Sequence, residues 1–182
     1  MTSSFDKGGL GFDATIAGSV VGTYWFLMLI GRMIGAAVGA KVSSKAMLTF
    51  VSSLGIILVL AAIFTPIGLQ ASMPVFRSDI SFGLNTIPMS IVFLVLCGLC
   101  TSVMWGGIFN LAVEGLGKYT ESASGFFMVM VCGGGILPLI QGYFADWLGY
   151  VNSYWVIVVA LVFLLYYALA GYRNVNKDIP VT

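Results

Sequence analysis

Five long apolar stretches constrain what this chain can fold into more than any other feature. They cover about residues 15–40, 46–65, 87–113, 122–145 and 152–172. Each has about the 20 residues that a helix needs to cross the hydrocarbon core of a bilayer. The stretches are continuous and lack the alternation of a membrane β-barrel, and only helices or closed barrels satisfy their backbone groups in lipid. The sequence therefore predicts an all-α, polytopic membrane protein with about five transmembrane helices.

The composition supports a lipid environment and narrows the chemistry. Hydrophobic residues make up 59% of the 182 residues and charged residues only 8%, against about 25% charged residues in soluble domains. The net charge of +1 gives no reason to expect a nucleic-acid partner. Histidine is absent and Cys97, Cys100 and Cys132 all lie in apolar stretches, so we expect packing cysteines, no metal site, no cofactor and no enzyme activity.

The basic residues in the short connections predict the sidedness of the helices. Positive residues favour the cytoplasmic side, and this places the C-terminus in the cytoplasm and the protein in the cell (inner) membrane as a multi-pass protein. An odd number of spans then leaves the N-terminus outside, and we expect a further helix before residue 1. The predicted cytoplasmic residues are Arg32, Lys41, Lys45, Lys118, Arg173 and Lys177, and the predicted outer ones are Lys7 and Arg77.

One connection is longer than the others, with about twenty residues between Pro66 and Thr86. It contains an alternating apolar pattern at Ile80, Phe82 and Leu84. We expect this segment to lie partly on the membrane surface.

Glycine is frequent and forms two patterns. Gly31, Gly35 and Gly39 recur every fourth residue, which predicts a helix face for close packing or sliding of a neighbour. In the fourth stretch, glycines 133–135 precede Pro138, and this combination predicts a weakened or bent helix. Such helices line cavities in transporters, although a kinked helix with a purely structural role is the alternative.

Two charged residues are predicted at the same depth near the cytoplasmic side. Arg32 lies near the end of the first stretch and Glu114 at the end of the third. We expect a buried or half-buried ion pair that ties these spans together. Snorkelling of Arg32 towards the interface is the alternative.

A few polar and aromatic side chains lie deeper in the predicted spans. Tyr, Trp, Asn and Gln bind sugars by stacking and by neutral hydrogen bonds, so we expect these residues to face one substrate path as a group. Packing or anchoring at the interface is the alternative for each residue alone. No acidic residue is placed at mid-membrane to relay protons. The substrate-path candidates are Tyr24, Trp25, Ser102, Trp105, Asn110 and Gln141.

Three sequence blocks together resemble one family, the fucose/glucose/galactose permease branch of the major facilitator superfamily. Residues 24–35, YWFLMLIGRMIG, are similar to its eighth helix with the Tyr-Trp and Gly-Arg-x-x-Gly elements. Residues 108–112, IFNLA, and 115–120, GLGKYT, are similar to the end of the tenth helix and the loop after it. Residues 133–142, GGGILPLIQG, followed by Ala145-Asp146 and Gly149, are similar to the eleventh helix and its exit.

The resemblance implies a twelve-helix carrier of two six-helix bundles that imports a sugar with a proton by alternating access. This chain would supply helices 8–12, part of the C-terminal bundle, over residues 1–182. The seventh helix and the N-terminal bundle, which carries the proton-coupling carboxylates in this family, would be missing partners. The tenth helix departs from the family pattern, with Trp105-Gly106-Gly107 in place of a Phe-Pro-Thr-like stretch and Asn110 at a usually small position. The identity of the sugar is therefore not carried over.

Two other kinds of protein are alternatives to a portion of a sugar carrier. The first is a small membrane protein that oligomerises into a channel or serves as an accessory subunit. The second, a membrane-embedded enzyme, is disfavoured because the spans contain no histidine, no paired carboxylates and no metal-ligand cluster.

Overall fold

The computed structural model describes residues 14–66, 68–76 and 81–172, without the side chains of residues 14, 132 and 133. Over these residues the protein is predominantly helical, and it is the all-α, polytopic membrane protein that the apolar stretches predict. A short two-stranded sheet is the only departure within the described ranges. The α-helices are α1 (Ala14–Gly39), α2 (Ser44–Phe64), α3 (Met89–Val113), α4 (Thr120–Met130), α5 (Ile136–Leu148) and α6 (Trp155–Tyr166).

Four helical segments of the described chain are long and apolar enough to cross a membrane. They are Thr15–Gly39, Ser44–Phe64, Met89–Val113 and Asn152–Gly171. The last of them joins a 3-10 turn, α6 and a closing π-helical turn. The remaining predicted stretch, 122–145, is occupied by α4 and α5 rather than by one uninterrupted helix.

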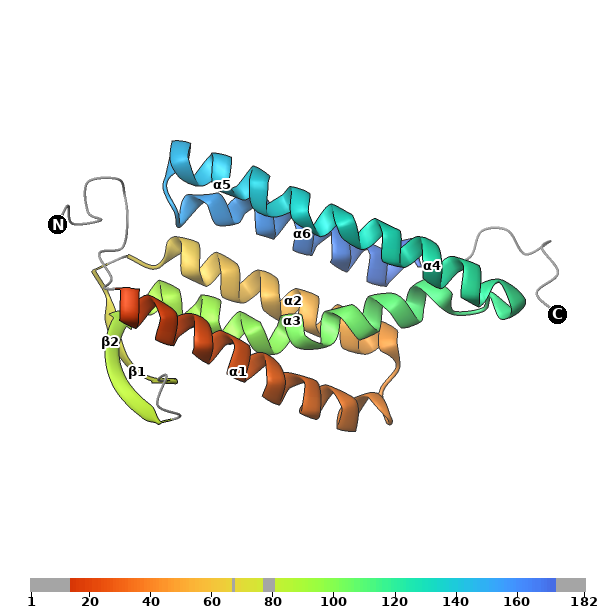
Figure 1. The fold of residues 1–182 in the computed structure, drawn as a ribbon, viewed down its shortest axis with the longest axis horizontal. Coiled ribbons are helices and arrows are strands. Elements are labelled where there is room, and N and C mark those ends of the chain that lie inside the picture. The colour runs from red at the N-terminus through yellow and green to blue at the C-terminus, as the bar shows by residue number, and fades with distance from the viewer. Residues whose placement is uncertain (1–13, 67, 77–80, 173–182) are drawn as a thin grey trace.

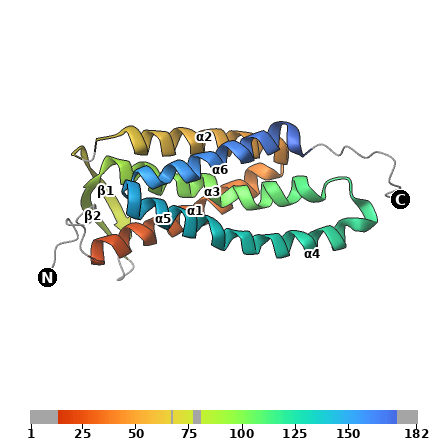
Figure 2. The same ribbon diagram turned by 90° about the horizontal axis from the view of Figure 1, so that it is seen from above.

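The break between α4 and α5 has a local cause. Residues Val131–Gly135 form a 3-10 segment, η3, between the two α-helices. Glycine weakens a helix because its backbone loses the most freedom on folding, and Pro138 has no N–H to donate to the carbonyl of Gly134. The two helices nevertheless follow one another along one side of the molecule (Figures 1 and 2). The glycines and Pro138 therefore interrupt this segment, as their positions predict.

The remaining helices pack around α3. This helix contacts α1 on one side and α2 on the other, and α2 also contacts α6. Figure 1 shows α4, α5 and α6 above the layer that contains α1 and α3. The buried core lies between α2, α3 and α6, whereas neither α4 nor α5 has a buried residue. The core side chains include Leu48 and Val59 of α2, Cys100 and Met104 of α3, and Leu161 of α6.

The long connection between α2 and α3 forms a β-hairpin. Strand β1 (Gln70–Phe76) pairs antiparallel with β2 (Phe82–Pro88). The apolar alternation that was expected to mark a segment on the membrane surface is therefore the two-residue repeat of a β-strand. The side chains of Phe82 and Leu84 are 57% and 74% exposed. Ile80, the third residue of the pattern, lies outside the described residues. Successive strand residues point to opposite faces, so these two side chains share one outer face.

The hairpin is attached to α1 by a hydrogen bond and by aromatic packing. The backbone N–H of Phe76 donates to Oγ1 of Thr23 over 2.8 Å. The rings of Phe26, Phe76 and Phe82 lie 5.4–5.5 Å apart between centroids. Val75, on β1, is fully buried. The hairpin is therefore a packed part of the fold at one end of α1.

The basic residues of the connections gather at the opposite end of the bundle. Lys41 follows α1, Lys45 lies in the first turn of α2, and Lys118 lies between α3 and α4. Figure 1 shows that the end of α1 and the end of α3 lie at this same side. The other residues used to predict sidedness, Lys7, Arg77, Arg173 and Lys177, lie outside the described residues.

Candidate functional site

Two grooves in the helical bundle contain most of the polar side chains that the sequence singles out. The tyrosine groove contains Tyr24 and Gln141. The arginine groove contains Arg32, Ser102 and Asn110. The expectation that all deep polar residues face one cavity is therefore wrong.

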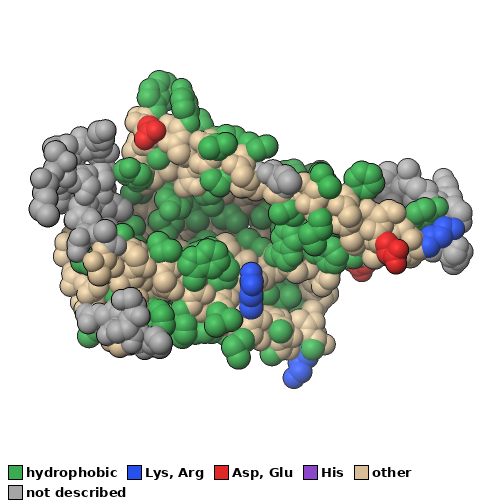
Figure 3. Space-filling model, in the orientation of Figure 1, with side chains coloured by type: hydrophobic (Ala, Val, Ile, Leu, Met, Phe, Trp, Pro, Cys, Tyr) green, Lys and Arg blue, Asp and Glu red, His purple; other side chains and the backbone are tan. Residues whose placement is uncertain are grey.

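The tyrosine groove lies between the two layers of the bundle and has a volume of about 420 Å³. Its polar side chains come from four different elements: Tyr24 from α1, Thr101 from α3, Gln141 from α5 and Tyr154 from the 3-10 turn η4 (Asn152–Tyr154). Apolar side chains form the rest of the wall, among them Val59. Figure 3 shows a hollow on this face, lined largely by hydrophobic side chains.

One hydrogen bond organises the polar side of this groove. The hydroxyl of Tyr24 lies 3.0 Å from Oγ1 of Thr101. Oγ1 of Thr101 also donates to the carbonyl of Gly98 over 3.2 Å, so the tyrosine hydroxyl is the donor in the contact between the helices. Gly98 permits this close approach, because a Cβ there would lie 2.9 Å from the backbone oxygen of Tyr24.

The sequence did not single out Thr101 or Tyr154. Thr101 is one hydroxyl in an apolar helix, and such hydroxyls commonly bond to their own backbone, so its sequence context carries no functional signal. Tyr154 lies at the start of the last span, where tyrosine is typical of the membrane interface. Only the packing of α1 and α5 against α3 and η4 reveals that both residues belong to the groove.

The tyrosine groove has the character of a binding site for a small neutral molecule. Ligand pockets are mostly apolar, with a few polar groups that fix orientation, and have volumes of about 300–1,000 Å³. Tyrosine and threonine hydroxyls donate and accept hydrogen bonds, and the glutamine amide does both. The groove therefore offers neutral hydrogen-bonding groups and no charged side chain among its described lining residues.

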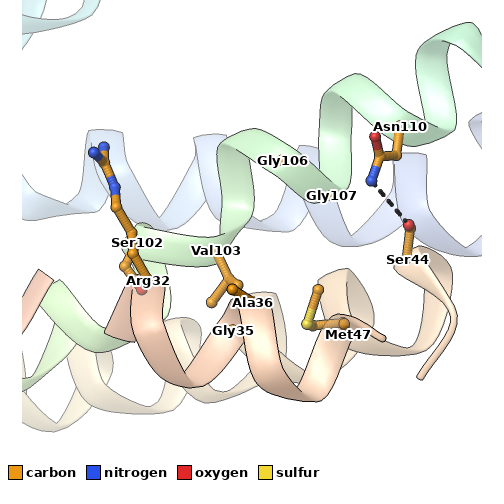
Figure 4. Close-up of a pocket in the computed structure, with 11 residues that line it drawn as sticks. Arg32, Gly35, Ala36, Ser44, Met47, Ser102, Val103, Gly106, Gly107 and Asn110 are labelled. Carbon is orange, nitrogen blue, oxygen red and sulfur yellow. Dashed lines mark hydrogen bonds between the residues drawn. The ribbon is translucent and has the colours of Figure 1, made fainter. Parts of the chain in front are cut away.

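The arginine groove lies at the contact of α1, α2 and α3 and has a volume of about 270 Å³. Arg32 lines it at one end, next to Ser102, as Figure 4 shows. At the other end, Nδ2 of Asn110 donates a long hydrogen bond of 3.5 Å to Oγ of Ser44. Gly106 and Gly107 of α3 lie between these two ends (Figure 4).

The glycines of α1 allow the close packing that their spacing predicts. A Cβ at Gly31 would collide with Ser102, and a Cβ at Gly35 would collide with Val103. A Cβ at Gly39 would lie in ordinary contact, 3.5 Å from the end of the Met47 side chain. Two of the three glycines are therefore required for the contact between α1 and α3.

The predicted ion pair between Arg32 and Glu114 is not formed. Arg32 lies at the level of Ser102, since the neighbouring Gly31 contacts that residue. Glu114 follows the end of α3 and is exposed. Glu114 comes twelve positions after Ser102, which places its carboxylate about 18 Å farther along the helix. The sequence estimate of equal depth was wrong because it ignored how far α3 extends past α1.

The other predicted residues lie outside both grooves. Trp25 is 60% exposed and contacts Tyr24 edge to face, with ring centroids 5.9 Å apart. Trp105 packs against Phe127 of α4, with centroids 5.3 Å apart. Pro138 is an exposed residue near the start of α5. Among the described residues, no group of three His, Cys, Asp or Glu side chains is placed to hold a metal ion.

Comparison with known proteins supports the resemblance carried by the sequence blocks. The chain is 29% identical over 164 residues to a glucose/galactose transporter of Brucella abortus, a match that covers 90% of this chain. It is 30% identical over 176 residues, 94% of its length, to a candidate glucose/galactose transporter of Helicobacter pylori. It is also 28% identical over 86 residues, 47% of its length, to the L-fucose-proton symporter of Escherichia coli.

The matches cover only part of each relative. The aligned region is 35% of the Brucella protein, 38% of the Helicobacter protein and 19% of the Escherichia protein. No protein-family model matches the chain, and no solved structure matches it. The aligned proteins are transporters rather than enzymes. The chain is thus similar over most of its length to glucose/galactose transporters, and over about half of its length to a fucose–proton symporter, in agreement with the resemblance that its motifs carry.

Proposed function

We propose that this chain takes part in the transport of a small sugar across the cell (inner) membrane, coupled to protons, and that it has no enzyme activity. The observation that carries the proposal is the tyrosine groove, in which hydroxyl and amide groups from four elements meet inside an apolar wall. The names of the relatives, two glucose/galactose transporters and a fucose–proton symporter, support a sugar as the substrate and a proton as the coupling ion.

The chain acts, in this proposal, as part of a larger alternating-access carrier. Alternating access requires one helix bundle to move against another around a central site. Two features support the need for further helices: the chain spans 35–38% of the length of the first two relatives, and α4 and α5 contain no buried residue. The C-terminus lies on the cytoplasmic side, in keeping with the basic residues gathered at that end of the bundle.

The direct test is sugar uptake by bacteria that lack their own glucose, galactose and fucose transporters. The chain is expressed alone or together with the part of the Helicobacter relative that lies outside the aligned region. We expect uptake of a labelled sugar only when both are present, and we expect a protonophore to abolish accumulation. Coupled uptake by this chain alone would contradict the need for further helices. Lack of uptake when both proteins are folded in the membrane would contradict sugar transport.

Substitutions in the groove test the site itself. Tyr24→Phe and Gln141→Leu each remove a neutral polar group, so the KM for the sugar is expected to rise by about tenfold, the effect of one lost hydrogen bond. Tyr143→Phe is the matched control, because Tyr143 is 68% exposed and does not line the groove. If the KM for the sugar is unchanged in both groove variants, the sugar does not bind in the tyrosine groove.

The same experiment addresses a channel or an accessory subunit. A channel would conduct the sugar without accumulation, would be insensitive to the protonophore and would require a stable oligomer of this chain in detergent. An accessory subunit would change the uptake of a complete host carrier without any uptake of its own.

A further inference from the structure

Arg32 places a positive charge well inside a transmembrane helix. It lies seven residues before the end of α1 at Gly39, which corresponds to about 10 Å along the helix axis. Figure 4 shows its side chain starting next to Ser102, with the guanidinium group projecting away from the end of the groove marked by Ser44. Arg32 is an exposed residue. Charged side chains at such positions are almost always paired or face a water-filled path. The side chain of Arg32 in Figure 4 therefore does not extend towards the end of α1 at Gly39, as it would if it snorkelled to the nearer membrane interface.

No described carboxylate faces this guanidinium. Arg32 is the only charged residue of α1, and Lys45 is the only one of α2. Helix α3 has no charged residue before Glu114 at its end. Glu121 is in the first turn of α4, and Asp146 is near the end of α5. All carboxylates of the described helical region are therefore at helix ends, away from the level of Arg32.

The arginine groove also has room for a close neighbour. A Cβ built on Gly106 would meet nothing within 4 Å, whereas a Cβ on Gly35 of α1 would collide with Val103 of α3. Ala36 and Gly106 are both exposed. Asn110 is exposed and makes only the long bond to Ser44 in the described structure, so its amide retains most of its hydrogen-bonding capacity. Small residues and polar amides of this kind are typical of contacts between transmembrane helices.

We propose that the arginine groove receives a further transmembrane helix that presents a carboxylate to Arg32. The charge of Arg32 selects an acidic side chain at its depth, and the open surface at Gly106 and Ala36 allows the helix backbone to approach. The inference rests on the proposed function, in which helices outside this chain complete the carrier. The length of the relatives supports such helices, because the chain spans 35% and 38% of the first two.

The test measures helix association in lipid vesicles and involves no transport, so it can fail independently of the proposed function. The full chain carries a donor fluorophore at its C-terminus, and a synthetic leucine–alanine transmembrane peptide carries the acceptor. Two versions of the peptide are compared: one has a single central Asp, and the other has the uncharged Asn at the same position. We expect the Asp peptide to reach half-maximal energy transfer at a peptide-to-lipid ratio about fivefold lower than the Asn peptide, as polar contacts between membrane helices allow.

Three variants locate the contact. Arg32→Gln should abolish the preference for Asp, and Arg32→Lys should retain most of it. Lys41→Gln, which removes a cation outside the groove, should leave the preference unchanged. Because Arg32→Gln could also reduce folding, Gly106→Leu provides a second probe: it fills open space and should weaken association of both peptides without unfolding the chain.

Two results would overturn the proposal. The first is equal association of the Asp and Asn peptides, or a preference for Asp that persists in Arg32→Gln. The second concerns a soluble carboxylate in place of a helix. If glucuronate, with no peptide present, protects the variant Ala36→Cys, which retains Arg32, from a water-soluble thiol reagent as well as the Asp peptide does, Arg32 faces an aqueous anion path and not a docked helix.

Discussion

The hydroxyl of Tyr24 lies 3.0 Å from Oγ1 of Thr101, although the two residues are 77 positions apart in the chain. The contact joins α1 to α3 at the wall of the tyrosine groove. It holds the ring of Tyr24 against Gly98, where a side chain would not fit. The alignment of the two helices and the shape of the groove therefore depend on the same pair.

Removal of either partner of this pair should destabilise the bundle modestly. Hydrogen bonds between transmembrane helices contribute about 0.6 kcal/mol on average, so Tyr24→Phe and Thr101→Val should each lower the free energy of unfolding by about that amount. The double variant should cost no more than either single variant if the side chains interact only with each other. Unfolding by SDS in bicelles measures all three, and strictly additive losses would show that the pair is not coupled.

The glycines of α3 should differ sharply in their tolerance of alanine. Gly98→Ala places a methyl group 2.9 Å from the backbone oxygen of Tyr24 and 3.0 Å from its ring. Overpacking of this kind costs about 1–3 kcal/mol. Gly106→Ala on the same helix meets open space, and it should be neutral or stabilising by up to about 1 kcal/mol because alanine is the better helix former. Equal stability of the two variants in the same unfolding assay would contradict this packing.

The attachment of the hairpin to α1 should depend on Thr23. Its hydroxyl donates to the carbonyl of Ser19 over 2.7 Å and accepts from the N–H of Phe76. Thr23→Val leaves that N–H without its acceptor, at a cost of about 1–3 kcal/mol for a buried group. Hydrogen exchange at Phe76 should accelerate, while exchange in α2 stays slow. Thr49→Val is the control, because the hydroxyl of Thr49 bonds only within its own helix. If exchange at Phe76 accelerates to a similar extent in Thr49→Val, the cause is a general loss of stability and not the loss of the Thr23 contact.

Pro138 should control the break between α4 and α5. Pro138→Ala restores a donor for the carbonyl of Gly134, and alanine is favoured over proline in a helix interior by about 3 kcal/mol. Spin labels at Phe126 and Tyr143, both exposed, should then show a narrower distance distribution as the 3-10 segment becomes α-helical. Leu139→Ala, a change at the next residue, should leave the distribution as it was. A distribution that is the same in all three proteins would assign the break to the glycines alone.

Much of the fold follows from local properties of the sequence. A run of about 20 apolar residues has few alternatives to a helix in lipid, so α1, α2 and α3 lie close to the expected stretches. Glycines before Pro138 weaken the helix wherever it lies, which explains the break at Val131–Gly135. The hairpin was missed because the alternation at Phe82 and Leu84 is equally typical of a surface segment and of a strand.

The sequence alone determined that this chain lies in a membrane, which residues are polar within its spans, and which family it resembles, because these properties depend on local composition and order. Only the tertiary structure decided which polar residues meet. Thr101 and Ser102 are adjacent in the chain, yet Thr101 lines the tyrosine groove and Ser102 the arginine groove. Successive helix residues point about 100° apart. The partners of each therefore depend on the rotation and offset of the neighbouring helices, which also separated Arg32 from Glu114.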